Sequence, residues 1–207
     1  ACFSCLWPWR VGGVGAGGPW GAPPAGRVAL SRGKGGDVTV ELDRAAETAM
    51  LQVLTQSAPA SCRVISEEVG EVEGGSGTWR VLIDPVDGSL NAKRGLEPYG
   101  ATVAVAAGSC LRDVVVGVVA DYVRGHRAIA VAGCGMASTR KVEGIDSSSR
   151  VELILTEMGR PENAVFSFRD MGVLAGTGDY RVRQIGSLAV SLANTALGVG
   201  DVLFCPA

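Results

Sequence analysis

Residues Val81–Asn91 read VLIDPVDGSLN, and this stretch decides how the chain folds and where its chemistry lies. An apolar run typical of a buried strand delivers Asp84 at its end, and Pro85 then interrupts the strand pattern. Asp87 follows at a predicted turn, and Gly88 allows the backbone to approach a ligand closely. A helix predicted to begin here would point its N–H groups at an anion. The stretch therefore places two carboxylates beside a helix N-terminus.

The chemistry of Asp84 and Asp87 has two interpretations. Carboxylate oxygens are the ligands that hard cations such as Mg²⁺ prefer, and a helix N-terminus suits a phosphate group. Together they indicate a site that binds a metal and a phosphate side by side. The alternative is a plain turn, because Asp-Pro and Asp-Gly are ordinary turn dipeptides.

Further acids lie upstream of this stretch. Glu67–Glu68 ends the preceding predicted strand, which would place it at the same sheet edge as Asp84, although two acids at a strand end also suit a solvated terminus. Gly35–Thr39 predicts a flexible loop that leads to Asp43 at a helix start. Asp43 is equally compatible with a plain helix N-cap.

The apolar pattern around these acids predicts an α/β or α+β domain. Ala46, Met50, Val53 and Leu54 recur on one face of a helix that follows Asp43. Runs rich in valine and isoleucine predict strands at Cys62–Ser66, Trp79–Ile83, Ala101–Ala107, Val114–Val119, Ala128–Val131, Val151–Thr156, Arg181–Ile185 and Val202–Phe204. Further predictions are a polar connection at Glu71–Thr78, a helix near Pro161–Met171, and a helix capped by Ser187 that ends at Gly198. Helices and strands cluster rather than alternate, which favours stacked layers with largely mixed or antiparallel sheets.

The bulk composition excludes several classes of protein. Hydrophobic residues make up 47% and aromatic residues 5%, so the core must consist of small aliphatic side chains. The 19 basic and 21 acidic residues lack the basic excess of a nucleic-acid binder. No apolar run reaches the roughly 18 residues that a membrane span needs. With one histidine, His126, and no G-x-S-x-G motif, a Ser-His-Asp mechanism is disfavoured. Six scattered cysteines suit a reducing compartment, and we expect a soluble, cytoplasmic protein.

Residues 1–26 form a low-complexity segment rich in glycine, proline and tryptophan, which we expect to be disordered or non-native. The segment contains a literal G-x-G-x-x-G at Gly13, Gly15 and Gly18. No strand precedes this motif and no helix follows it, so a dinucleotide site is rejected. Residues 27–207 are expected to form the functional domain.

Four stretches of the sequence resemble the inositol monophosphatase family, including its archaeal-type fructose-1,6-bisphosphatase relatives. Ile83–Asn91 resembles the D-P-[IV]-D-G-[ST]-x-N signature of that family, and Ile65–Glu68 resembles its Glu-Glu motif. Lys34 and Gly36–Asp43 are similar to its upstream K and D-x-V-T-x-x-D segment. Arg183–Ser187 resembles the later G-[ST] helix start. The nine-residue signature, with the Glu-Glu pair upstream, makes this resemblance specific.

The resemblance implies a layered α/β/α/β/α sandwich and a Mg²⁺-dependent phosphatase that hydrolyses a small sugar or inositol phosphate monoester by metal-activated water. It implies two or three Mg²⁺ ions, with ligands from Glu67, Asp84, the Val86 carbonyl and Asp87, and with Asp84 bridging two ions. It assigns orientation of the water to Glu67 and Ser89, and support of a third ion to Asp43. It assigns substrate and phosphate contacts to Asp87, Gly88, Ser89 and Ser187. A homodimer is also expected by resemblance, with no nucleic-acid or membrane partner.

One feature departs from the family pattern. A further acidic motif is expected soon after Val202–Phe204, and the sequence reaches Ala207 without it. We therefore expect the C-terminal layer to be incomplete. The alternative function is a catalytically incomplete metal- and phosphate-binding fragment, or a non-catalytic homologue.

Overall fold

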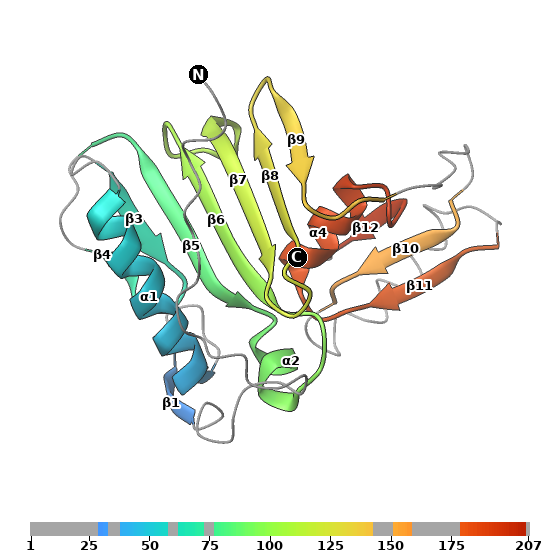
Figure 1. Cartoon of the computed structure of the whole chain (residues 1–207), viewed down its shortest axis with the longest axis horizontal. Helices are drawn as coiled ribbons and strands as arrows, with labels where there is room; N and C mark the ends of the chain where they lie inside the picture. The colour runs from blue at the N-terminus through green and yellow to red at the C-terminus, as the bar shows by residue number, and fades with distance from the viewer. Residues whose placement is uncertain are drawn as a thin grey trace.

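The structure is a computed structural model that describes residues 29–32, 38–57, 62–72, 77–142, 151–158 and 179–205 (Figure 1). The segment 1–26 and the helix predicted near Pro161–Met171 lie outside these residues. The described helices are α1 (Glu41–Ser57), α2 (Ser89–Arg94) and α4 (Leu188–Ala196), with a 3₁₀ turn at Leu111–Asp113. Among the described residues, no helix has both the length and the apolar character needed to cross a membrane.

The larger sheet has seven strands in the described part of the chain, in the order β4-β3-β5-β6-β7-β8-β9. Their bounds are β3 Arg63–Ser66, β4 Gly70–Val72, β5 Arg80–Asp87, β6 Gly100–Ala106, β7 Val114–Asp121, β8 Arg127–Val131 and β9 Gly135–Ser138. Strands β3 and β5 are parallel, and the other neighbouring pairs are antiparallel. The prediction of a mixed, largely antiparallel sheet is confirmed.

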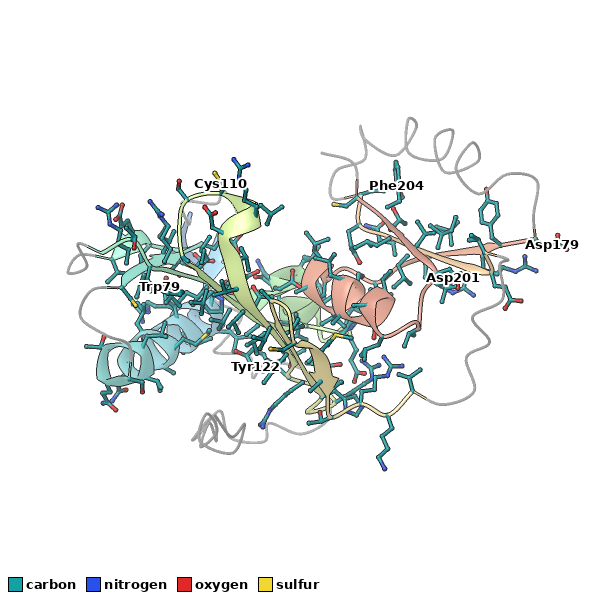
Figure 2. All side chains as sticks on the ribbon, turned by 90° about the horizontal axis from the view of Figure 1, so that it is seen from above. Trp79, Cys110, Tyr122, Asp179, Asp201 and Phe204 are labelled. Carbon is teal, nitrogen blue, oxygen red and sulfur yellow. The ribbon has the colours of Figure 1, made fainter. Side chains whose placement is uncertain are left out.

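Two smaller sheets complete the described strands. Strands β10 (Leu153–Thr156), β11 (Arg181–Gln184) and β12 (Val202–Phe204) form a parallel sheet with β10 at its centre. Strands β1 (Ala29–Arg32) and β2 (Val38–Val40) form an antiparallel pair just before α1. Helix α1 packs against β5, and Figure 2 shows α4 between the large and the small sheet. Helix, sheet, helix and sheet thus follow one another, as predicted for a layered sandwich.

Several elements differ from the sequence prediction. Strand β5 continues through Pro85 to Asp87, whereas the apolar run predicted an end near Ile83. The ladder between β5 and β6 is irregular between Asp84 and Asp87, and such a bulge accommodates a residue without an N–H. Short strands β1, β2, β4 and β9 were not predicted, because each has only three or four residues and includes or lies near glycine, a residue typical of turns.

A small apolar cluster fixes the edge of the large sheet at which β5 ends. Ala46 of α1, Val86 of β5 and Ala92 of α2 are buried together, and Leu42 and Tyr99 pack against them. Ala92 is completely buried, so α2 is held close to the strand that leads into it. The end of β5 is therefore held between two helices.

Candidate active site

The acidic residues identified in the sequence meet at one edge of the molecule. Figure 1 shows the start of α1, the ends of β3 and β5, and α2 at this edge. Because β3 and β5 are parallel with Ser66 opposite Ile83, Glu67, which follows the last residue of β3, lies beside Asp84 in β5. The Glu67 amide donates to the Ile83 carbonyl at 3.1 Å, which extends the pairing by one residue. The predicted juxtaposition of these two acids is confirmed.

Asp84 carries the most perturbed carboxyl group at this edge. Burial and the negative charges of Glu67 and Asp87 raise the pKa of Asp84 from 3.8 to about 8, and a hydrogen bond with Glu67 contributes. The Val86 amide donates to Oδ1 of Asp84 at 3.0 Å, which favours the charged form but does not outweigh burial. Full ionisation of Glu67, Asp84 and Asp87 is therefore unfavourable in this partly buried site.

Asp87 is directed toward α4. Its carboxylate accepts a hydrogen bond from the Ser187 hydroxyl, and it also accepts the Leu188 amide at 3.2 Å and the Ala189 amide at 2.8 Å. Asp87 therefore satisfies N–H groups that a helix leaves unpaired at its N-terminus. Ser187 occupies the N-cap position, but its hydroxyl makes no capping bond and binds Asp87 instead. The predicted Ser187 cap is wrong in this respect, because a carboxylate 100 residues away takes that role.

Gly88 forms the tight turn between β5 and α2, and Ser89 is the first residue of α2. Gly88 has φ +86°, and a Cβ atom there would lie 2.9 Å from the Gly186 carbonyl oxygen. Only glycine permits this approach of two backbone segments without strain. The Ser89 hydroxyl donates to the Val86 carbonyl at 2.8 Å, so this oxygen already has a donor. The helix predicted to begin after Gly88 is confirmed as α2.

Residues that were not predicted hold this arrangement in place. Asn91 is buried and donates to the carbonyls of Pro98 and Ile185 at 2.8 and 2.7 Å, which ties α2 to the start of α4. Glu157, just after β10, accepts the Gly186 amide and, at 2.6 Å, the Ser191 hydroxyl. Asn91 ends the stretch Val81–Asn91, so it could have been identified from the sequence. Glu157 follows a predicted strand, but no local pattern linked it to the site.

Tyr122 is a further neighbour of this edge that the sequence did not reveal. Its hydroxyl donates to the Pro85 carbonyl at 3.0 Å. Burial and the nearby Asp84 charge raise the pKa of Tyr122 to about 12, so the hydroxyl stays protonated as a donor. It supplies a side-chain donor to the bulged part of β5, where the ladder to β6 is irregular.

The predicted site residues are brought together only in part. Within the described ranges, no group of three or more His, Cys, Asp and Glu side chains is arranged closely enough to hold a metal ion. Glu67 and Asp84 are paired, whereas Asp87 faces α4. Asp43 is 1% exposed and lies in the first turn of α1. It is therefore inside the helix, and the N-cap alternative is wrong.

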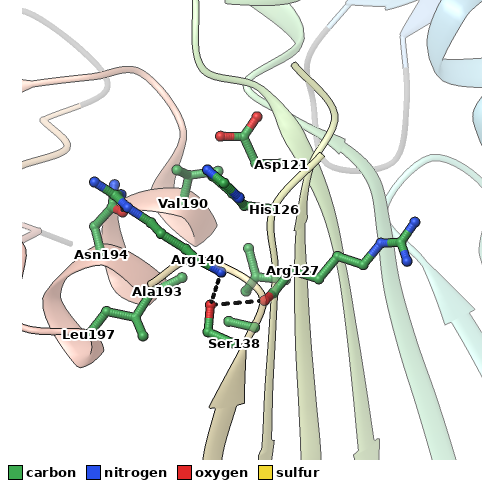
Figure 3. Close-up of a pocket in the computed structure, with 11 residues that line it drawn as sticks. Asp121, His126, Arg127, Ser138, Arg140, Val190, Ala193, Asn194 and Leu197 are labelled. Carbon is green, nitrogen blue, oxygen red and sulfur yellow. Dashed lines mark hydrogen bonds between the residues drawn. The ribbon is translucent and has the colours of Figure 1, made fainter. Parts of the chain in front are cut away.

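A separate pocket lies between α4 and strands β7 to β9 (Figure 3). His126, Asp121, Ser138 and Arg140 line it on the sheet side, and Asn194 lies on the α4 side. Arg140 is held there by hydrogen bonds to Asn194 and Ser138. None of the predicted site residues lines this pocket, so it is distinct from the carboxylate edge.

Comparisons with known proteins agree with this fold and these motifs. The model of the inositol monophosphatase family matches residues 25–205. A fructose-1,6-bisphosphatase/inositol-1-monophosphatase from Methanothermobacter thermautotrophicus is 32% identical over 191 residues, which cover 87% of this chain and 66% of that protein. A Nus factor SuhB from Haemophilus influenzae is 30% identical over 125 residues, or 60% of this chain and 45% of that protein.

The same fold is found among solved structures. A Thermotoga maritima IMPase superposes with a TM-score of 0.68 at 21% identity, covering 87% of this chain and 68% of that chain. The chain spans less than two thirds of the length of the curated relatives that it matches.

Proposed function

We propose that this chain, which belongs to the inositol monophosphatase family, is the metal-dependent core of a phosphatase for a small sugar or inositol phosphate monoester. The observation that carries the proposal is the pairing of Glu67, just after β3, with Asp84 in the parallel strand β5, three residues before that strand ends at the turn into α2. Oxygen ligands on a rigid sheet edge are what a Mg²⁺-dependent phosphatase requires.

The chemistry of these residues fits a hard divalent cation. Their donors are all oxygen atoms, and the raised pKa of Asp84 reflects burial and then the negative charges of Glu67 and Asp87, which a cation would offset. Mg²⁺ would be held by Glu67, Asp84, the Val86 carbonyl and Asp87, with Asp43 near a third ion. Bound Mg²⁺ supplies activation of a water and stabilisation of the leaving oxygen.

The chain's own residues would orient the reactants. Glu67 and Ser89 position the attacking water, and the Ser89 hydroxyl remains close to Val86. Gly88, Ser89 and Ser187 would contact the phosphate, since the Gly88 turn brings the start of α2 close to Ser187 at the start of α4. Asp87 would bind a cation through Oδ1, which among the described residues accepts only the Leu188 amide, while Oδ2 accepts both the Ser187 hydroxyl and the Ala189 amide. No covalent nucleophile is needed, since phosphoryl transfer depends mainly on positioning and charge neutralisation.

Phosphate release tests this function. The chain would be incubated with inositol monophosphate, fructose 1,6-bisphosphate, histidinol phosphate and a nucleotide 3′-phosphate, each with Mg²⁺ or with a chelator. We expect release from at least one substrate with Mg²⁺ and none with the chelator. Release that does not depend on Mg²⁺ would overturn the mechanism, and no release from any substrate would favour the second candidate.

That second candidate is a non-catalytic protein that binds metal and phosphate. Some relatives bear the name Nus factor rather than the name of an enzyme, and this favours considering it. The two candidates are separated by direct binding: the second predicts binding of Mg²⁺ and phosphate without turnover. A homodimer, a cytoplasmic location, a small phosphorylated sugar or polyol as the substrate, and the absence of a nucleic-acid or membrane partner stay predictions.

The raised pKa of Asp84 predicts how stability depends on pH in the absence of divalent cations. Between 3.8 and about 8, the folded protein binds more protons at Asp84 than the unfolded chain does. The free energy of unfolding contributed by Asp84 therefore falls as pH rises through this range. Mg²⁺ should offset this fall at the alkaline end, because it binds the charged carboxylate.

Thermal unfolding at a series of pH values, with a chelator and then with Mg²⁺, measures this effect. Asp84→Asn should flatten the metal-free profile, because the amide does not titrate. Asp113→Asn, in the turn between β6 and β7, is the control and should still show the fall in stability with pH, because Asp84 is present in this variant. Equal slopes in wild type and Asp84→Asn would show that another group is responsible.

A further inference from the structure

Glu47 is a buried carboxylate that the proposed chemistry does not use. It lies in the second turn of α1 and is 5% exposed. Burying a carboxylate is costly unless hydrogen-bond donors compensate for the lost water. The residues that donate hydrogen bonds to Glu47 therefore indicate which part of the structure the buried carboxylate stabilises.

The donors to Glu47 flank the turn that carries Glu67. The Ser66 hydroxyl donates to Oε1 of Glu47 at 2.5 Å, and the Val69 amide donates to the same oxygen at 3.3 Å. Ser66 is 2% exposed, so this contact is shielded from water. One carboxylate oxygen thus holds both ends of the turn that follows β3.

The opposite side of the same turn is fixed to β5. The Glu67 amide donates to the Ile83 carbonyl at 3.1 Å, one residue before Asp84. Glu67 is therefore held between α1 and β5, and its side chain reaches Asp84. In Figure 1, the start of α1 lies beside the ends of both strands, as this bracing requires.

We propose that Glu47 is a positioning residue that sets the placement of Glu67 relative to Asp84, and thereby the affinity of the site for a divalent cation. The inference rests on the proposed function, since it takes Glu67 and Asp84 as metal ligands. Removing a residue that orients a metal ligand by hydrogen bonding commonly lowers metal affinity about 10- to 100-fold. The role of Glu47 is to accept hydrogen bonds, so its shape and acceptor oxygen are more important than its charge.

Binding of Mn²⁺ alone to the folded protein, measured by calorimetry, tests this role. Glu47→Ala should weaken binding about 10- to 100-fold, and Ser66→Ala should weaken it in the same direction by a smaller factor. Glu47→Gln should restore most of the affinity, because the amide oxygen still accepts from Ser66 and Val69. Glu41→Ala, which removes an exposed glutamate from the same helix, is the control and should bind like wild type.

The possible outcomes distinguish the two proposals. A role of Glu47 in stability alone would lower the melting temperature without changing the Mn²⁺ affinity of the folded protein, and this result would overturn the positioning role. Equal weakening by Glu47→Gln and Glu47→Ala would also overturn it, because charge would then be the cause. If Glu47→Ala does not fold, Ser66→Ala serves as the test. Unchanged Mn²⁺ affinity of folded Ser66→Ala would then overturn the positioning role. A wild-type chain that binds no Mn²⁺ would overturn the proposed metal site, and with it this role.

Discussion

Asp84→Asn is expected to lower Mg²⁺-dependent phosphate release by roughly 10²- to 10⁴-fold. Metal-assisted charge stabilisation contributes several kcal/mol, and each 1.4 kcal/mol or so corresponds to a tenfold change in rate. Asparagine has the shape of aspartate but lacks the negative charge that Asp84 would supply to the proposed metal site. Its oxygen can still accept the Val86 amide, which now donates at 3.0 Å, so the bulge of β5 should persist.

The control for this experiment is Asp113→Asn, which makes the same chemical change at the opposite end of β6. It should leave turnover within about twofold of wild type, because Asp113 lies away from the carboxylate edge and asparagine keeps an oxygen that accepts the Cys110 amide. Circular dichroism would confirm that both variants are folded. If folded Asp84→Asn kept wild-type turnover, the assignment of Asp84 as a metal ligand would be wrong.

Gly88→Ala is expected to damage both stability and activity. The residue has φ +86°, which costs an L-amino acid about 1–2 kcal/mol. The added Cβ would also lie 2.9 Å from the Gly186 carbonyl oxygen and 3.3 Å from that of Pro98. Moving two backbone segments to make room costs about 1–3 kcal/mol more. The shift would also separate Ser187 from Asp87, so phosphate release should fall even in the folded fraction.

Gly133→Ala is the matched control for this substitution. Gly133 has φ +74°, but a Cβ there meets nothing within 4 Å. Gly133→Ala should therefore lower the free energy of unfolding only by the cost of the positive φ, about 1–2 kcal/mol. Urea unfolding of the two variants measures the difference. Equal losses at Gly88 and Gly133 would contradict the close packing of the Gly88 turn against the start of α4.

The sequence predicts those parts of the fold for which neighbouring residues show a clear pattern. The strands from β5 to β8 were predicted because each has five to eight residues with a dense β-branched pattern. Strands β4 and β9 were missed, since three or four residues with glycine carry no clear period. The end of β5 was misplaced because proline usually stops a strand, whereas here a bulge admits it.

The candidate site shows the same division between local and distant signals. Glu67, Asp84, Asp87 and Gly88 were identified because their spacing belongs to one strand pair and one turn. The orientation of Asp87 toward α4 depends on residues about 100 positions away, which no local pattern encodes. Glu47 could have been identified from the sequence, because it is four residues after Asp43 and therefore on the same helix face. Its partner Ser66 is identified only once α1 is packed beside β3.

The most direct test of the central claim is a crystal structure of this chain grown with Mn²⁺ and inorganic phosphate, with anomalous scattering recorded for manganese. The claim is that Glu67, Asp84 and Asp87 hold a divalent cation beside a phosphate. We predict a manganese peak within about 2.5 Å of carboxylate oxygens of Glu67 and Asp84, as for hard cations bound by oxygen. We also predict that Oδ1 of Asp87 binds the metal, with the phosphate at Gly88 and Ser89. A well-ordered site without manganese, with Oδ1 of Asp87 still bound to the Leu188 amide, would contradict the account.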